Sequence, residues 1–215
     1  MKALLRIKLL YNHAEVQISD LMCDGQFLSY QDVFEQAPLY MPMSVPPANA
    51  HVPMAERNNQ VIQEKARALY HRLPYKVMPR VMIRYLVMLV TSQLNWFPVK
   101  EGLSDYFSPH AIIKRFAIDY KACRIPFGSY VMASTEPKRK NTLAARMEEA
   151  IYLRPSKFMH NGHEVMDLNS GRVLRPGRVV PLPITDKVIA RVEAMGNTQQ
   201  MKSCLLYTSP SPRDS

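Results

Sequence analysis

Residues 53–73, PMAERNNQVIQEKARALYHRL, carry the clearest periodic pattern in this chain of 215 residues. Ile62, Ala66 and Leu69 recur at the three- and four-residue spacing that gives a helix one apolar face. Pro53 suits the first turn of a helix, where no backbone N–H is needed for an internal hydrogen bond. The stretch therefore predicts a long helix that packs one side against a core.

The sequence after this helix changes from helical to strand-like periodicity. A second, mostly apolar helix is expected at 79–96, and Ser108-Pro109 has the residue types of a helix start. Beyond Pro126 the apolar residues alternate as they do in strands. The expected elements there are strands at 127–133, 149–153, 164–168 and 172–182, a tight hairpin at 169–171, and a helix at 186–195 that ends at Gly196.

The sequence before residue 53 is mixed. Residues 2–14 have the pattern of an amphipathic helix, and an apolar run ending at Met22 predicts a short buried strand, followed by a turn at Asp24-Gly25. A short helix near 31–36 and a short strand near 39–45 follow between prolines. Helices and strands together predict an α/β or α+β fold.

The formal charge is +10, from 28 Lys and Arg against 18 Asp and Glu. A basic protein is suited to contact a polyanion such as nucleic acid, although a solvated surface of mixed charge is equally compatible with this composition. Residues 98–196 contribute +6 and residues 1–97 contribute +3. The second half is therefore the expected contact surface.

The three cysteines lie far apart and show no zinc-type spacing, which favours a reducing, intracellular compartment. The longest apolar run, near 81–90, contains Arg84 and is too short to span a bilayer. The N-terminus has no signal-peptide pattern. These features favour a protein that works away from membranes.

Two segments carry candidate chemistry. The first is Asp24-Gly25-Gln26-Phe27 at a strand end, and the second is residues 51–62, HVPMAERNNQVI, at the start of the long helix. Together they resemble the second and third acidic motifs of the integrase core in copia-type retrotransposon polyproteins. Further matching motifs follow in the same order up to Gly196, among them LNWFP at 94–98, YFSP at 106–109 and HEVMDL at 163–168.

The resemblance implies that Asp24 and Glu56 are the second and third carboxylates of an Asp-Asp-Glu triad. Such a triad holds Mg²⁺ or Mn²⁺, because hard ions prefer oxygen ligands, and the ions stabilise the attacking and leaving oxygens of DNA strand transfer. Taken alone, Asp24 is more simply a turn residue, and Glu56 suits the first turn of a helix without any catalysis. Asp20 is a weaker competitor for the strand-end role.

The resemblance also implies DNA as the partner, with other Pol polyprotein segments beside it, oligomer formation, and a location in a cytoplasmic particle and the nucleus. The basic residues expected to contact phosphates are Arg57, Lys65, Arg67, Arg72, Lys138, Arg139 and Lys140.

The expected division is a truncated ribonuclease H-like integrase core at 1–75, a helical extension at 76–120 and a small β-rich module at 121–196. The last module is expected to resemble the small β-barrel that follows integrase cores. Residues 197–215 look like a translated sequencing adapter and are treated as an artefactual tail.

This chain departs from the family pattern at two points. The first catalytic Asp of the family and its zinc-binding His-Cys module have no counterpart in this sequence. The first hypothesis is therefore an integrase fragment that is inactive on its own. The alternative is a non-enzymatic nucleic-acid-binding or scaffold segment. Its contacts would come from Lys138, Arg139, Lys140, Arg172, Arg175 and Arg178. A chain with no function of its own is the third possibility.

Overall fold

The structure is a computed structural model. It describes residues 2–36, 40–45, 53–100, 102, 104–119, 123–134, 146–156 and 162–200, without the side chains of Pro53 and Met54. These residues form both helices and sheets, which confirms the α+β expectation in its coarse form. Among the described helices, none has the length and apolar character needed to cross a lipid bilayer.

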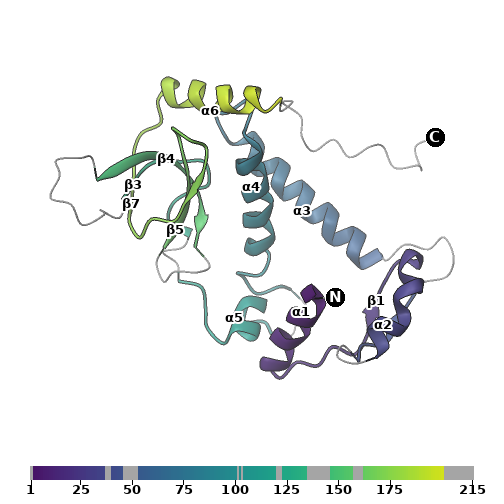
Figure 1. The fold of residues 1–215 in the computed structure, drawn as a ribbon. Coiled ribbons are helices and arrows are strands. Elements are labelled where there is room, and N and C mark those ends of the chain that lie inside the picture. The colour runs from purple at the N-terminus through teal and green to yellow at the C-terminus, as the bar shows by residue number, and fades with distance from the viewer. Residues whose placement is uncertain are drawn as a thin grey trace. The chain divides into compact units, whose positions relative to one another are not determined.

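The chain forms two compact units (Figure 1). Unit 1 comprises Met1–Ile62 and Leu94–Ile118, and unit 2 comprises Gln63–Gln93 together with the chain from Asp119 onward. The long helix α3, Pro53–His71, runs from the first unit into the second.

Unit 1 is built from short elements around a small parallel sheet. Its members are α1 (Lys2–His13), β1 (Leu21–Met22), the 3₁₀ helix η1 (Gly25–Tyr30), α2 (Gln31–Glu35), β2 (Met43–Ser44), the first part of α3, and α5 (Pro109–Lys114). β1 and β2 pair in parallel, with Leu21 opposite Met43 and Met22 opposite Ser44. The predicted strand before Asp24 therefore exists, but it is not buried as expected, since Met22 is 61% exposed. Two short strands are too few to shield both of their faces.

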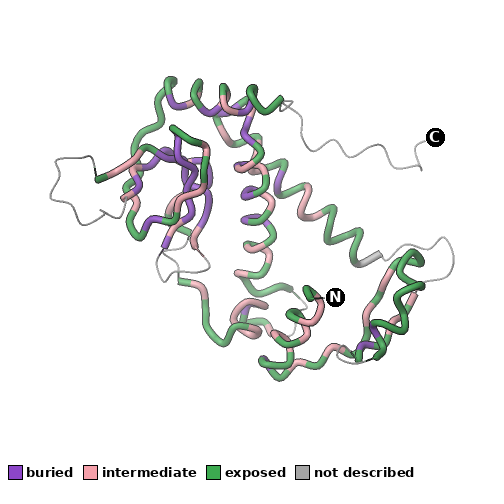
Figure 2. The backbone as a smooth tube through the Cα atoms, in the orientation of Figure 1, coloured by how far each residue is buried: buried purple, intermediate pink, exposed green. Residues whose placement is uncertain are grey.

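The core of unit 1 is correspondingly small. Phe34 and Met41 are buried, and five half-buried side chains pack against them: Leu4, Leu5, Ile18, Leu21 and Met43. Of the 17 large apolar side chains that are exposed among the described residues, 13 belong to unit 1. Figure 2 shows the same contrast, with most buried residues in the strands and helices of unit 2.

Unit 2 contains a five-stranded antiparallel sheet in the order β6-β5-β4-β3-β7. The strands are β3 (Tyr130–Ser134), β4 (Met147–Pro155), β5 (His163–Asp167), β6 (Val173–Leu174) and β7 (Val179–Pro181). The last part of α3, α4 (Arg80–Gln93) and α6 (Asp186–Thr198) complete the unit.

One face of the sheet of unit 2 carries an apolar cluster that reaches both of its edges. Its buried members include Val131, Tyr152 and Val165. Leu174 of β6 and Val179 of β7, which lie on the two edge strands, pack against this cluster beside the strands with which they pair. The small β-barrel expected for residues 121–196 stays a prediction.

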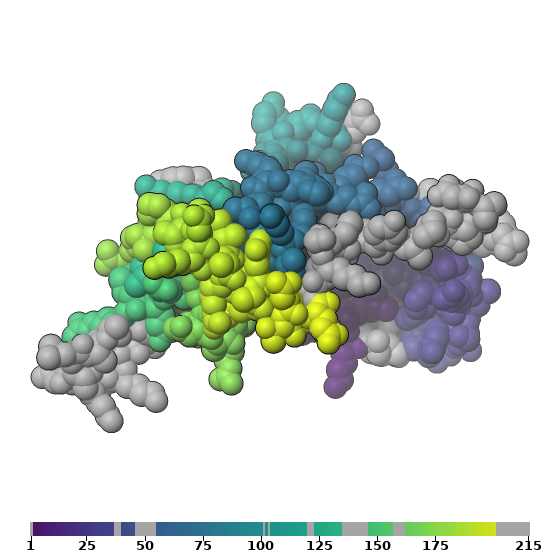
Figure 3. Space-filling model, turned by 90° about the horizontal axis from the view of Figure 1, so that it is seen from above, coloured from purple at the N-terminus to yellow at the C-terminus, as the bar shows by residue number. Residues whose placement is uncertain are grey.

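Helix α6 lies against the start of α4 in unit 2. The carboxylate of Glu193 accepts the backbone N–H of Lys76 at 2.7 Å, and the side chain of Gln199 accepts that of Arg80 at 2.9 Å. Figure 3 shows α6 in yellow against the blue surface of this segment. The first N–H groups of a helix have no partner within it, and Gln199, directly after α6, supplies an acceptor for the first of them in α4.

Two sequence-based predictions in unit 2 are wrong in detail. The single strand expected at 172–182 is two strands on opposite edges of the sheet, separated by the buried Pro176, which has no N–H to donate to a ladder. The helix expected to end at Gly196 continues to Thr198. Gly196 is buried within α6, and a Cβ added to it would lie 3.1 Å from the backbone carbon of Met78. It serves close packing and does not end the helix.

Candidate metal-binding and nucleic-acid-binding residues

Asp24 lies two residues after the carboxyl end of β1, where it caps the helix η1. Its Oδ1 accepts the backbone N–H of Gly25 at 2.7 Å. The side chain is exposed, so one carboxylate serves the turn and remains open to solvent. The prediction that Asp24-Gly25 forms a turn is thus confirmed. The same carboxylate is still exposed and could also bind a metal ion.

Glu56 lies in the first turn of α3, the helix that follows β2 along the chain, and its side chain is also exposed. Asp24 and Glu56 both belong to unit 1. Each therefore follows one strand of the parallel β1–β2 pair. In parallel sheets, functional side chains gather beyond the carboxyl ends of neighbouring strands.

The donor atoms of this pair suit a hard divalent ion, which is commonly bound by one or two carboxylates together with substrate phosphates. Within the described residues, no three side chains of His, Cys, Asp or Glu lie close enough to hold an ion together. A metal site at Asp24 and Glu56 would therefore rest on two carboxylates that belong to the same unit and are separated by 32 residues in the sequence.

The basic residues expected to hold phosphates are distributed over both units. Arg57 lies in unit 1, while Lys65, Arg67 and Arg72 lie in unit 2, and all four side chains are exposed. Lys65 and Arg67 flank the buried Ala66 on α3, so they point away from the side that packs. Lys138, Arg139 and Lys140 lie outside the described residues.

The net positive charge of the protein comes from unit 2. Over the full sequence, unit 1 has 7 Lys and Arg against 8 Asp and Glu, and unit 2 has the remaining 21 and 10. The net charges are therefore −1 and +11, which together give the +10 of the chain. A division of the sequence into halves does not reveal this, because residues 63–93 fold with unit 2 and residues 94–118 with unit 1.

Three exposed arginines, Arg172, Arg175 and Arg178, lie on the connection from β5 through β6 to β7. We call residues 172–178 the arginine segment. The backbone of this segment is tied to the sheet, while its arginine side chains are exposed.

A buried ion network lies beneath the arginine segment, and the sequence analysis missed it. Glu164 of β5 is fully buried; its Oε2 accepts the Arg154 Nε–H at 2.6 Å and its Oε1 accepts the Arg175 Nε–H at 3.1 Å. The Arg154 guanidinium also lies over the ring of Tyr85 in α4, 5.0 Å from its centroid. The available signal was weak: Arg154 follows the apolar run 150–153 and Glu164 precedes Val165 and Met166, and charges buried beside such runs are almost always paired.

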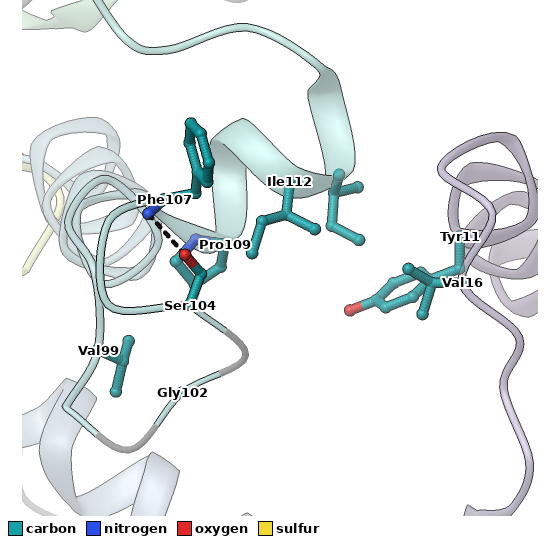
Figure 4. Close-up of a pocket in the computed structure, with 9 residues that line it drawn as sticks. Tyr11, Val16, Val99, Gly102, Ser104, Phe107, Pro109 and Ile112 are labelled. Atoms are coloured by element: carbon teal, nitrogen blue, oxygen red, sulfur yellow. Dashed lines mark hydrogen bonds between the residues drawn. The ribbon is translucent and has the colours of Figure 1, made fainter.

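Unit 1 has an apolar pocket of about 130 Å³ between the end of α1 and the segment around α5 (Figure 4). Tyr11 and Val16 line one side, and Val99, Phe107 and Ile112 are among the residues on the other. The Ser104 hydroxyl accepts the backbone N–H groups of Tyr106 and Phe107, which fixes the loop at its rim. None of the candidate metal-binding or phosphate-binding residues lines this pocket, whereas Phe107 and Pro109 belong to the YFSP motif at 106–109.

Neither a scan against protein-family models nor a search of curated proteins finds a match to this chain.

Proposed function

We propose that this chain is a DNA-binding segment of a retrotransposon-type integrase region, with Asp24 and Glu56 as two of its metal-binding carboxylates. The observation that carries this proposal is the placement of both carboxylates in unit 1, each after one strand of the parallel β1–β2 pair. The order of motifs along the sequence supports it, and the five-stranded antiparallel sheet of unit 2 is compatible with the small β-barrel expected there. A ribonuclease H-like core in unit 1 is part of the same proposal.

We expect Asp24 and Glu56 to bind a metal ion in this chain without supporting the joining of DNA. Asp24 and Glu56 would hold Mg²⁺ or Mn²⁺ through oxygen atoms that are exposed to solvent. The ion, when bound, would stabilise negative charge on the oxygens of a phosphodiester. We expect metal binding without joining of DNA ends, because two carboxylates are one fewer than the triad that the resemblance implies.

Calorimetric titration of the full chain with Mn²⁺ tests the metal site. We expect Asp24→Asn and Glu56→Gln each to abolish or strongly weaken binding. Asp20→Asn and Glu64→Gln remove exposed carboxylates from the same strand region and the same helix, so they serve as matched controls and should bind as the original chain does. Equal binding by all five proteins would overturn the assignment of this pair.

An end-joining assay with Mg²⁺ or Mn²⁺ and DNA ends tests the expected inactivity. Joined products that disappear in Glu56→Gln would show that the described carboxylates are sufficient, and the expectation of inactivity would then be wrong.

A second candidate function is a non-enzymatic polyanion-binding module. The observation that favours it is the confinement of the positive excess to unit 2, which does not include Asp24 or Glu56. Such a module should bind duplex DNA with an affinity that falls steeply with salt, because binding releases counterions from the phosphates. Binding that persists in Asp24→Asn and is indifferent to Mg²⁺ supports this candidate. Binding that requires the ion supports the integrase assignment.

A further inference from the structure

We propose that the arginine segment of unit 2 binds the phosphates of duplex DNA, and that buried Glu164 is a positioning residue that holds Arg175 for this contact. The inference rests on the DNA-binding part of the proposed function. It adds the type of DNA and a positioning role for Glu164, a residue that is too deeply buried to touch DNA.

The backbone of the arginine segment is fixed by the sheet. The carbonyl of Arg172 accepts the N–H of Asp167 at 2.9 Å, that of Pro176 accepts His163 at 3.0 Å, and that of Arg178 accepts Ser134 at 3.0 Å. Two strands thus hold the segment at three points, one on β3 and one at each end of β5. A fixed backbone lowers the entropy lost when its side chains bind a ligand.

Glu164 also holds one of the arginine side chains in place. Its carboxylate is buried and bridges two guanidinium groups, one buried on Arg154 and one on Arg175, whose side chain is 53% exposed. The formal charges of these three side chains sum to +1, and Arg175 is the member whose side chain reaches the surface. Because the Nε–H of Arg175 is held by Glu164, the guanidinium plane is oriented before any phosphate arrives.

The surroundings of the segment favour duplex over single-stranded DNA. Proteins that bind single strands stack the bases on exposed aromatic rings. Within the described part of unit 2, the large apolar side chains that are exposed are aliphatic: Met88, Val180, Leu182 and Ile184. Among the described residues, the exposed Phe and Tyr side chains belong to unit 1. The described part of unit 2 therefore offers guanidinium groups for phosphates without exposed Phe, Tyr or Trp rings on which bases could stack.

Fluorescence anisotropy with the full chain tests the inference, using a mixed-sequence duplex and one of its strands at several salt concentrations. Arg175→Gln should raise the Kd for the duplex several-fold and lower the slope of log K against log salt by about 1, the loss of one phosphate contact. Lys187→Gln removes an exposed positive charge from α6 in the same unit and is the matched control. It should have a smaller effect.

The role of Glu164 requires a variant that separates orientation from charge. The double variant Arg154→Met/Glu164→Leu removes one positive and one negative charge, so the net charge is unchanged, and it replaces the buried pair with apolar groups that a folded interior tolerates. We expect the duplex Kd to rise to nearly the value for Arg175→Gln. In Glu164→Gln the chain becomes more positive, so a purely electrostatic surface would bind DNA more tightly, while a positioned arginine would bind it less tightly.

The outcomes distinguish failure of the DNA-binding function from failure of the roles given to Arg175 and Glu164. If the original chain does not bind duplex DNA at low salt, the DNA-binding proposal fails. If it binds, but Arg175→Gln and the double variant keep its Kd and salt slope, the function stands and the inference is overturned. Tighter binding of the single strand than of the duplex would overturn the assignment of DNA type. Thermal unfolding of each variant confirms that the compared proteins are folded.

Discussion

The hydroxyl of Tyr75 donates a 2.7 Å hydrogen bond to the carbonyl oxygen of Gly128, and both residues are buried in unit 2. This bond fixes the loop before α4 to the turn that begins β3. The turn requires a glycine, because Gly128 has φ +82° and a Cβ there would lie 2.6 Å from a methyl of Leu73.

Replacement of Tyr75 by Phe should destabilise unit 2 by roughly 1–3 kcal/mol, because a buried carbonyl would lose its donor. Urea unfolding followed by circular dichroism measures this. Tyr106→Phe, at a side chain that is 89% exposed, should leave the free energy of unfolding unchanged. Equal midpoints for the two variants would show that the buried bond contributes no stability.

Stability at alkaline pH should also depend on Tyr75. Burial raises the pKa of this phenol well above its ordinary value of about 10. The phenol therefore loses its proton at a lower pH in the unfolded chain than in the folded chain. The contribution of protonated Tyr75 to the free energy of unfolding is fully present below about pH 10 and is lost as the pH rises further. Unfolding midpoints measured across this range should fall less steeply in Tyr75→Phe than in the original chain.

Replacement of Gly196 by Ala should destabilise α6 although alanine favours helices. The added methyl would meet Val77 at 2.8 Å and the backbone of Met78 at 3.1 Å, and backbone cannot move aside cheaply. Overpacking of this kind costs about 1–3 kcal/mol, against a helix-propensity gain of about 1 kcal/mol. Denaturant unfolding tests the sign, with Gly177→Ala as control, because no atom lies within 4 Å of a Cβ at that position. A more stable Gly196→Ala would show that α6 shifts to make room.

The turn after β5 should make unit 2 sensitive to acid. Burial alone would raise the pKa of Asp167, but hydrogen bonds from Ser170 and Asn169 and the charge of Arg191 outweigh it and lower the pKa. The unfolded carboxyl therefore takes up a proton first, so stability is present above about pH 4 and is lost as the pH falls through the lower folded-state value. Asp167→Asn should flatten the acid limb of the stability curve. An acid limb identical to that of the original chain would exclude this role.

The buried pair Arg154 and Glu164 should show strong coupling. Glu164→Leu alone should cost roughly 3–5 kcal/mol, since it leaves a buried guanidinium without its carboxylate, whereas the double variant with Arg154→Met should cost much less. A double-mutant cycle of unfolding free energies measures the difference. Additive losses would mean that the two residues act independently.

Local features of the fold could be predicted from the sequence. Ser108 caps α5 as expected, with its hydroxyl accepting the N–H of Ala111 at 3.1 Å, and Pro53 begins α3. These signals act within one turn of the chain, so neighbouring residues suffice to read them. The alternation after Pro126 likewise located strands in unit 2.

Features that depend on distant partners could not be predicted. The two strands within 172–182 pair with different neighbours, β6 with β5 and β7 with β3, and nothing local distinguishes them apart from Pro176. Gly196 looked like a helix end because its partner, Met78, is over a hundred residues away in the sequence. The net charge of unit 2 could not be predicted either, because residues 63–93 lie in the first half of the sequence but fold with the second.

The position of β7 matters while the protein is being made. β3 emerges from the ribosome well before Val179–Pro181, the strand that covers its open edge. Until then a nascent chain presents a row of unpaired backbone groups beside an apolar core, which is a template for pairing with other chains. A stop codon shortly before Val179 removes both β7 and α6, so the shortened product should expose this edge and aggregate.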